Sequence, residues 1–111
     1  MVLICIEKTT ASHDSFWQSG VFVVNVLRES QQHLSERFAA PAEDKFEDVD
    51  FRPGIEGVPV LINALASLEC RLAHAYDGGD HTIFVGFVEN VTIGDGDPLI
   101  YFHHGYAGAK H

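Results

Sequence analysis

Two apolar-rich segments, separated by a four-residue polar turn, constrain the fold of this 111-residue chain more than any other feature. The first segment alternates in polarity, so one face is expected to carry every second residue, namely Leu68, Cys70, Leu72, His74 and Tyr76. The turn Asp77–Asp80 contains two glycines, and the second segment runs from His81 to about Thr92. Alternation with a period of two is typical of a half-buried strand, and short turns that contain glycine join antiparallel strands. The two segments therefore predict a long antiparallel β-hairpin.

Four further apolar segments predict strands, and two other segments predict short helices. The additional strands are expected over Val2–Glu7, Val21–Leu27, Val60–Leu65 and Leu99–His103. One helix is expected over about Ser12–Ser19, because hydroxyl side chains precede it and Gly20 follows it. A second helix is expected from Ser30, a candidate N-cap, to about Ala39. Six strands joined mostly by short turns predict a mainly β fold, an antiparallel barrel or sandwich.

The size and charge of the chain restrict the number of domains and the kinds of partner that it can have. A length of 111 residues with 46% hydrophobic residues predicts a single domain, residues 1–111, with a buried core. The 16 acidic residues against 7 lysines and arginines give a net charge of −9, which argues against nucleic acid or an anionic membrane as a partner. No apolar run approaches the roughly 20 residues that a membrane-spanning helix needs.

The cysteine and histidine spacings predict neither a disulfide framework nor a metal site. Cys5 and Cys70 lie in apolar, strand-like segments without CxxC spacing, so they are expected to be buried thiols in a reducing cytoplasm. His103 and His104 are adjacent, and adjacent residues on a strand point to opposite faces, so both cannot readily bind one ion. We therefore expect no metal.

Residues 41–58 differ in composition from the rest of the chain. The segment contains six acidic residues and only two basic ones, and Phe46 and Phe51 lie among them in the sequence. Loops longer than about 12–15 residues are usually functional or mobile. The segment is expected to be a long loop. It is either a solvated acidic loop held by the two phenylalanines, or a segment that covers an active site or contacts another subunit.

Several motifs, in their order and spacing, resemble those of the flavin reductase family. These motifs are Cys5-Ile6-Glu7-Lys8, Phe22-Val23-Val24-Asn25-Val26-Leu27, Ser35-Glu36-Arg37-Phe38-Ala39, Gly57-Val58-Pro59-Val60-Leu61, Leu68-Glu69-Cys70-Arg71, Gly79-Asp80-His81 and Gly94-Asp95-Gly96-Asp97-Pro98-Leu99-Ile100-Tyr101-Phe102. The resemblance covers almost the whole chain and implies an antiparallel FMN-binding split barrel. The family's pattern normally begins some tens of residues earlier, so this chain is expected to lack the usual N-terminal strands. Phe87 also departs from the pattern, since a glutamate is more usual there.

The resemblance implies binding and catalytic roles for particular residues. His81 is implied to contact the nicotinamide, with Asp80 orienting its imidazole or shaping the turn; a polar pair at a turn is the structural alternative. The cofactor-binding residues implied are Lys8, Thr9, Thr10, Ser12, His13, Arg37, Phe38, His81 and Tyr106. By composition, Lys8–His13 is the best local anion site, although helix capping explains its hydroxyls as well. Arg37 could equally be a solvated helix charge, and Tyr106 an aromatic residue packed on the barrel.

The activity implied by the resemblance is the reduction of FMN or FAD by NADH or NADPH, in which the cofactors do the chemistry and the protein orients them. The implied acceptor of the reduced flavin is a flavin-dependent monooxygenase. A cytoplasmic homodimer, with or without strand exchange, is expected because missing strands leave sheet edges exposed. The alternative is a catalytically weakened or inactive split-barrel module that binds flavin or stabilises a subunit.

Overall fold

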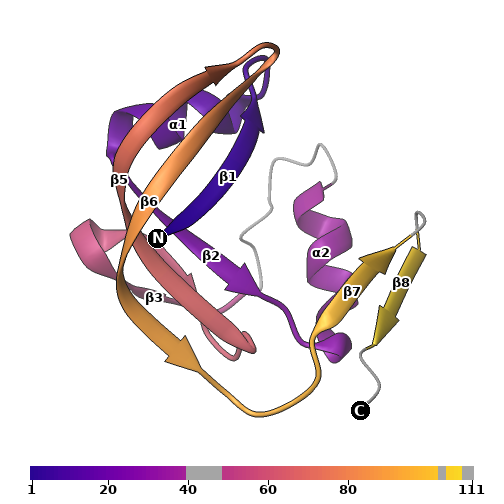
Figure 1. Ribbon diagram of the computed structural model, residues 1–111. Helices are drawn as coiled ribbons and strands as arrows, with labels where there is room; N and C mark the ends of the chain where they lie inside the picture. Colours follow the sequence, from indigo (N-terminus) through magenta and orange to yellow (C-terminus); the bar gives the residue numbers. More distant parts are fainter. Residues whose placement is uncertain (40–48, 103–104, 109–111) are drawn as a thin grey trace.

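The computed structural model describes residues 1–39, 49–102 and 105–108, and strands predominate among them (Figure 1). In chain order the elements are β1 (Val2–Glu7), α1 (Ala11–Ser19), β2 (Val21–Val26), η1 (Glu29–Gln31), α2 (Gln32–Ala39), β3 (Phe51–Pro53), η2 (Ile55–Gly57), β4 (Pro59–Leu61), β5 (Ala66–Gly78), β6 (His81–Ile93), β7 (Leu99–Phe102) and β8 (Gly105–Gly108), where η denotes a 3-10 turn. The mainly β class and the two helices expected from the sequence are confirmed.

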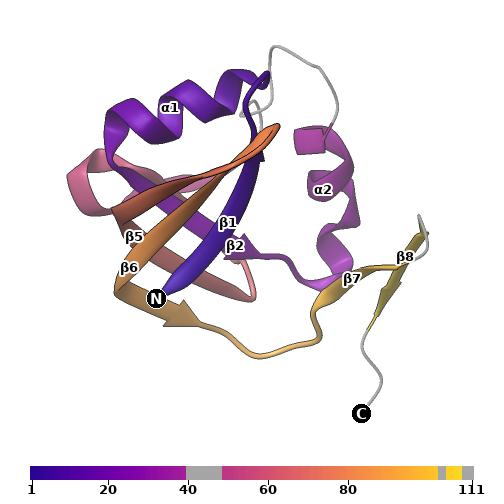
Figure 2. The same cartoon turned by 45° about the horizontal axis from the view of Figure 1, so that its top comes forward.

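A four-stranded antiparallel sheet, in the order β1-β6-β5-β2, forms the main body of the molecule. Its centre is the long hairpin of β5 and β6, which confirms the prediction from the alternating segment. The first two strands of the chain flank this hairpin, because β1 pairs with β6 and β2 pairs with β5. Figures 1 and 2 show the sheet curling, with α1 lying against one of its faces. Two smaller sheets contain β3 with β4 and β7 with β8.

Three short strands, β3, β4 and β8, differ from what the sequence predicts. The strand expected over Val60–Leu65 ends as β4 at Leu61, because Asn63 has left-handed backbone angles (φ 68°) that end an extended segment. β3 pairs with β4, so residues 49–58 are not the continuous loop that the composition predicts; residues 41–48 of that segment lie outside the described part. β8, which pairs with β7, is not among the strands expected from the sequence.

A β-bulge in β5 changes which of its residues share a face. The pairing between β5 and β6 shifts twice: Glu89 is an extra residue in β6, between the partners of Glu69 and Cys70, and Ala73 is an extra residue in β5. A residue added to a strand changes the face of the residues beyond it relative to strict alternation. His74 therefore lies on the opposite face from Leu72. The prediction that Leu68, Cys70, Leu72, His74 and Tyr76 share one face is wrong.

The main sheet has an inner face, which α1 covers, and an outer face, on which several large side chains are exposed. Phe84 of β6 is fully buried on the inner face, with its ring centroid 5.9 Å from that of Phe16 and 6.2 Å from that of Trp17. Phe22 of β2 contacts Phe16 edge to face, and a Cβ atom on Gly86 would collide with the Phe22 ring. The outer face consists of residues that are register partners across β1, β6 and β5, namely Leu3, Cys5, His74, Tyr76, Ile83, Val85 and Phe87. Cys5 is exposed on this face, so the prediction of a buried thiol is confirmed for Cys70 and wrong for Cys5.

The ends of the helices follow local chemistry. Gly20 ends α1 in the left-handed conformation (φ 70°) and donates its N–H to the Phe16 carbonyl at 3.4 Å, as the sequence predicts. Thr10 occupies the N-cap position of α1, but its hydroxyl donates to the Glu7 carbonyl and does not cap the helix. η1 precedes α2, so Ser30 lies inside a 3-10 turn and is not the N-cap that the sequence predicts.

Candidate functional site

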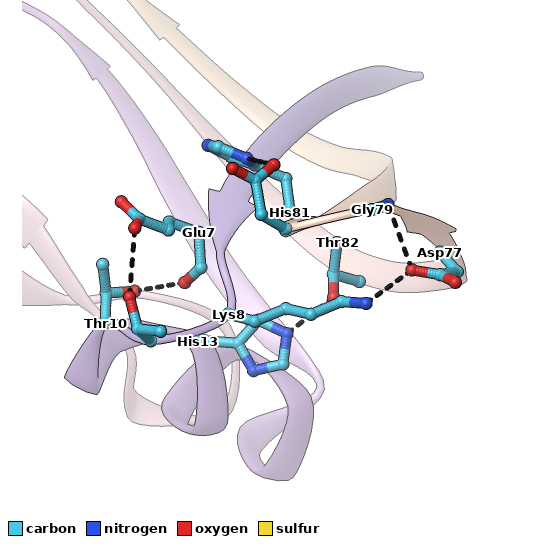
Figure 3. Close-up of polar contacts among 10 residues, drawn as sticks. Glu7, Lys8, Thr10, His13, Asp77, Gly79, His81 and Thr82 are labelled. Carbon is cyan, nitrogen blue, oxygen red and sulfur yellow. Dashed lines mark hydrogen bonds and ion pairs between the residues drawn. The ribbon is translucent and has the colours of Figure 1, made fainter.

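The hairpin tip, residues Asp77–His81, lies next to the end of β1 (Figure 3). Gly79 has a left-handed φ of 81°, and its N–H donates to Asp77 Oδ1 at 3.2 Å. An aspartate that accepts from the residue two positions later stabilises such a turn. The Lys8 N–H donates to the Asp80 carbonyl at 2.9 Å, so the main chain that follows β1 is fixed to the tip.

Asp80 and His81 form a polar pair at this tip. His81 Nδ1 lies 2.8 Å from Asp80 Oδ1, and the hydrogen bond from His81 lowers the pKa of the Asp80 carboxyl below its usual range. The carboxylate is 86% exposed and the imidazole 41% exposed. Of the two neutral tautomers, an anionic acceptor at Nδ1 favours the one with its proton on Nδ1, in which Nε2 is a hydrogen-bond acceptor. The pair therefore presents an oriented, accessible imidazole.

The side chains just before α1 are hydrogen-bonded within the chain. Lys8 Nζ lies 2.5 Å from Asp77 Oδ1, and this hydrogen bond lowers the pKa of Asp77, with the lysine charge adding to the effect. The Thr9 hydroxyl donates to Glu7 Oε1 at 3.1 Å, and the Thr10 hydroxyl donates to the Glu7 carbonyl at 2.8 Å. The predicted anion site thus has its ammonium and two of its hydroxyls engaged with protein acceptors.

His13 lies on the opposite side of the sheet from His81 (Figure 3). Its Nε2 is 2.7 Å from the Thr82 hydroxyl, and its ring centroid is 5.5 Å from that of Phe84 on the inner face. The His13 side chain is only 16% exposed. Because His81 and Thr82 are adjacent on β6, their side chains point to opposite faces. The structure therefore separates two histidines that the sequence interpretation assigns to one cofactor site.

Asp77 and Thr82 are polar residues of this region that the sequence interpretation did not single out. A signal for Asp77 exists, since an aspartate two residues before a turn glycine such as Gly79 predicts a side-chain acceptor for the turn. Alternation from His81 also predicts that Thr82 points inward. It does not predict the partner of Thr82, because His13 is 69 positions away in the sequence.

The remaining predicted cofactor residues lie elsewhere in the fold. Arg37 and Phe38 are on α2, where the Phe38 ring contacts Phe51 edge to face with 6.4 Å between centroids. Tyr106 is on β8, and Ser12 is in the first turn of α1. Figures 1 and 2 place α2 beside the β7–β8 hairpin and away from α1. The predicted residues thus divide into one group around the hairpin tip and α1 and another on α2 and β8.

Two clefts lie away from the hairpin tip. The larger, of about 610 Å³, is lined by residues of α1, β2 and the segment around η2, namely Ser15, Phe16, Ser19, Val21, Phe22, Val23, Glu56, Gly57, Val58 and Pro59. The smaller, of about 410 Å³, is lined by Arg28, Glu29, Ser30, Gly96 and Asp97. Neither lining includes a residue predicted for the site. Across residues 1–39, 49–102 and 105–108, no helix is long and apolar enough to cross a membrane, and no group of three His, Cys, Asp or Glu side chains could hold a metal ion.

Known proteins resemble this chain in sequence and in structure. Residues 1–110 match the family described as flavin reductase like domain. The chain is 38% identical to the reductase subunit HsaB of a flavin-dependent monooxygenase from Mycobacterium tuberculosis, covering 99% of this chain and 60% of HsaB. It is 42% identical to flavin reductase (NADH) from Kitasatospora aureofaciens, covering 96% of this chain and 58% of that protein.

A solved structure is similar over nearly the same extent. It is that of the NADH:FAD oxidoreductase SgcE6 from Streptomyces globisporus C-1027, in complex with NAD and FAD fragments. The two share 34% identity and a TM-score of 0.89, over 95% of this chain and 65% of that one. This chain therefore spans about 60% of the length of the curated relatives that it matches. The match over residues 1–110 and the relatives above 30% identity confirm the expected split-barrel fold, and the chain belongs to the flavin reductase like domain family.

Proposed function

We propose that this protein reduces FMN or FAD with NADH or NADPH, and that His81 and Asp80 form the pair that contacts the nicotinamide. The observation that carries the proposal is the hydrogen-bonded Asp80–His81 pair, exposed at the hairpin tip of a flavin reductase like domain. The relatives named flavin reductase (NADH) and NADH:FAD oxidoreductase support the reaction and both cofactors.

Protein side chains need not take part in the chemical step of this reaction. The bound nicotinamide and flavin supply hydride transfer themselves, and the protein contributes binding and orientation. Asp80 accepts from His81 Nδ1, so it holds the ring and leaves Nε2 as an acceptor. A nicotinamide fits this group, because its carboxamide carries N–H donors that Nε2 would accept.

The residues that bind the flavin remain predictions: Thr9, Thr10, Ser12, His13, Arg37, Phe38 and Tyr106. Arg37 offers a cation in the last turn of α2, and guanidinium groups bind phosphate in a bidentate manner. The N-terminal turn of α1, after Thr10, presents N–H groups that suit an anion. The Lys8 ammonium is paired with Asp77.

We also propose that the protein is a homodimer that supplies reduced flavin to a flavin-dependent monooxygenase. The HsaB relative is the reductase subunit of such an enzyme. Support for a dimer comes from the outer face, where Leu3, Tyr76 and Phe87 are each more than half exposed, and from β1, which is an edge of the main sheet. Exposed apolar faces and strand edges favour association with another chain. The free cysteines Cys5 and Cys70 support the cytoplasm as the compartment.

The first test is a fluorescence titration of the purified chain with FMN and FAD, followed by NADH and NADPH oxidation with each flavin. We expect saturable flavin binding and flavin-dependent oxidation. His81→Ala should lower kcat/KM roughly 5- to 100-fold, because losing one hydrogen bond at a site costs about 1–3 kcal/mol. The matched control is His74→Ala, which removes an exposed histidine of the same outer face and should keep wild-type activity.

The outcomes separate the reductase from its alternative. Flavin binding without oxidation of NADH or NADPH would favour a split-barrel module that has lost its activity. A folded chain that binds neither FMN nor FAD would overturn the reductase proposal. Light scattering on the same samples tests the dimer, and a monomer at micromolar concentration would contradict it.

A further inference from the structure

We propose that Lys8 and Asp77 are positioning residues for His81: their ion pair, called the tip ion pair below, holds the hairpin tip in the form that orients the imidazole. The proposal rests on the reductase function proposed above. It replaces, for Lys8, the role of flavin ligand that the sequence resemblance implies. It also adds Asp77 to the candidate site.

Lys8 joins β1 to the hairpin tip through both its side chain and its main chain. Its Nζ lies 2.5 Å from Asp77 Oδ1, and its N–H donates to the Asp80 carbonyl at 2.9 Å. Asp77 Oδ1 also accepts the Gly79 N–H at 3.2 Å. Figure 3 shows the lysine side chain running along the tip to reach this carboxylate. Lys8, which directly follows β1, and the Asp77 carboxylate therefore hold the turn both before and after Gly79.

The tip carries more negative than positive charge, which disfavours a second anion there. Glu7, Asp77 and Asp80 all lie at the tip or at the end of β1, and the net charge of the chain is −9. To bind a flavin phosphate, the Lys8 ammonium would have to leave Asp77 and the phosphate would then face these carboxylates. A positioning role requires no such exchange of partners.

His81 depends on the tip ion pair because it follows the residue that the turn holds in place. The Asp80 carboxylate is the partner of His81 Nδ1, and the Asp80 carbonyl is the group to which the Lys8 N–H donates. Glu7 and His81 are register partners across β1 and β6. A loosened turn would therefore disturb the carboxylate and the imidazole together.

The expected effect is modest, because the Lys8 and Asp77 side chains are 41% and 78% exposed. Exposed ion pairs change an equilibrium by roughly two- to fivefold. Lys8→Met and Asp77→Asn should each lower kcat/KM by this factor, and the double variant should be no worse than either one. Asparagine retains an acceptor for the Gly79 N–H, so Asp77→Asn removes the charge and keeps the turn.

The kinetic test measures kcat/KM for FMN and for riboflavin, which lacks the phosphate. A positioning role predicts equal losses with both flavins for Lys8→Met and for Asp77→Asn, and wild-type values for Lys8→Arg. A loss with FMN alone in Lys8→Met, together with unchanged or tighter FMN binding in Asp77→Asn, would overturn the proposal. That result would show an ammonium released from Asp77 to bind the phosphate.

The matched control is Glu89→Gln, which removes the Arg71–Glu89 ion pair (2.7 Å) elsewhere on the same hairpin. It should leave kcat/KM unchanged with both flavins. Losses in this variant equal to those of Lys8→Met would overturn a specific role for the tip ion pair, because they would show that any ion pair of the hairpin has the same influence.

A readout independent of catalysis separates this proposal from the reductase function. The NMR shifts of the His81 ring protons and the hydrogen exchange of the Lys8 N–H report on the tip whether or not the chain oxidises NADH. We expect Lys8→Met and Asp77→Asn to move the His81 shifts alike and to speed exchange at residue 8. Unchanged shifts in both variants would overturn the positioning role even in an active reductase. An inactive wild type with responsive shifts would refute the reductase function and support the positioning of His81.

Discussion

The inner and outer faces of the main sheet are built from the same strands but differ in what they expose. On β6, Thr82, Phe84 and Gly86 point toward the α1 side and are buried, whereas His81 and Phe87 point away from α1 and are accessible. Residues that stabilise the fold and residues of the candidate site therefore occupy adjacent positions along β6. Substitutions at neighbouring residues of β6 should have different effects, and this difference can be measured.

The largest contrast between the faces is expected between Phe84 and Phe87. Phe84 is fully buried against Phe16 and Trp17, so Phe84→Ala should lower the free energy of unfolding by about 3–5 kcal/mol. Phe87 is 54% exposed, and Phe87→Ala should cost less than about 1 kcal/mol. Urea unfolding followed by Trp17 fluorescence measures both. Equal losses would show that the outer face is also buried, as it would be by a second copy of the chain.

A smaller effect on the free energy of unfolding is expected from a substitution at Gly86, on the inner face. A Cβ atom there would collide with the Phe22 ring and approach Cys70 Cβ to 3.0 Å. Gly86→Ala should therefore destabilise the fold by about 1–3 kcal/mol through overpacking. In the Phe22→Leu background the same change should cost less, because the smaller side chain leaves room. Additive losses in the two variants would contradict the close approach of residues 86 and 22.

The next contrast tests the hydrogen bond that crosses from β6 to α1. Thr82 is buried and its hydroxyl lies 2.7 Å from His13 Nε2, so Thr82→Val should cost about 1 kcal/mol in the free energy of unfolding. Thr82→Ser keeps the hydroxyl and should retain most of this contribution. The activity of Thr82→Val should stay close to that of the wild type, since its side chain is on the face opposite His81. A loss of activity without a loss of stability would place His13 in the site.

The smallest effect is expected at the hairpin tip, which low pH should loosen. The hydrogen bonds from Lys8 and His81 hold the pKa values of Asp77 and Asp80 below those in the unfolded chain, which are about 3.9. Their stabilising contribution is therefore fully present above about pH 4 and is lost as the pH falls through the lower folded values. The free energies of unfolding of the wild type and of Asp77→Asn, measured between about pH 2.5 and about pH 6, should converge at the acid end. A constant difference between them would contradict the assignment.

Much of the fold could be predicted from local sequence patterns. Alternation and the glycine turn predict the β5–β6 hairpin, and Gly20 predicts the end of α1. The short strands β3 and β8 could not be predicted, because three or four residues carry too little periodicity. The bulges in β5 and β6 could not be predicted for a related reason, since an extra residue in one strand is defined only by its pairing with another.

The candidate site could be predicted by residue type better than by arrangement. Asp80 and His81 are adjacent, and the structure joins them by a hydrogen bond. The partners of Lys8 and His13 are each 69 positions away, at Asp77 and Thr82. Those contacts follow from the register of β1 on β6 and from the position of α1, which one sequence does not reveal. The sequence therefore predicts that Lys8 binds an anionic ligand, whereas in the structure Lys8 forms an ion pair with Asp77.

The position of β1 at an edge of the main sheet also has a consequence for the order of folding. Among the residues that the structure describes, β1 (Val2–Glu7) pairs with residues 81–86, so this pairing cannot form during synthesis until β6 has been made. At about 5 to 20 residues per second, this delay lasts roughly 4 to 15 s. The β5–β6 hairpin contains local contacts and can form within roughly 1–10 μs once both strands have emerged. β1 is thus made before β5 and β6 but joins the sheet after they have paired.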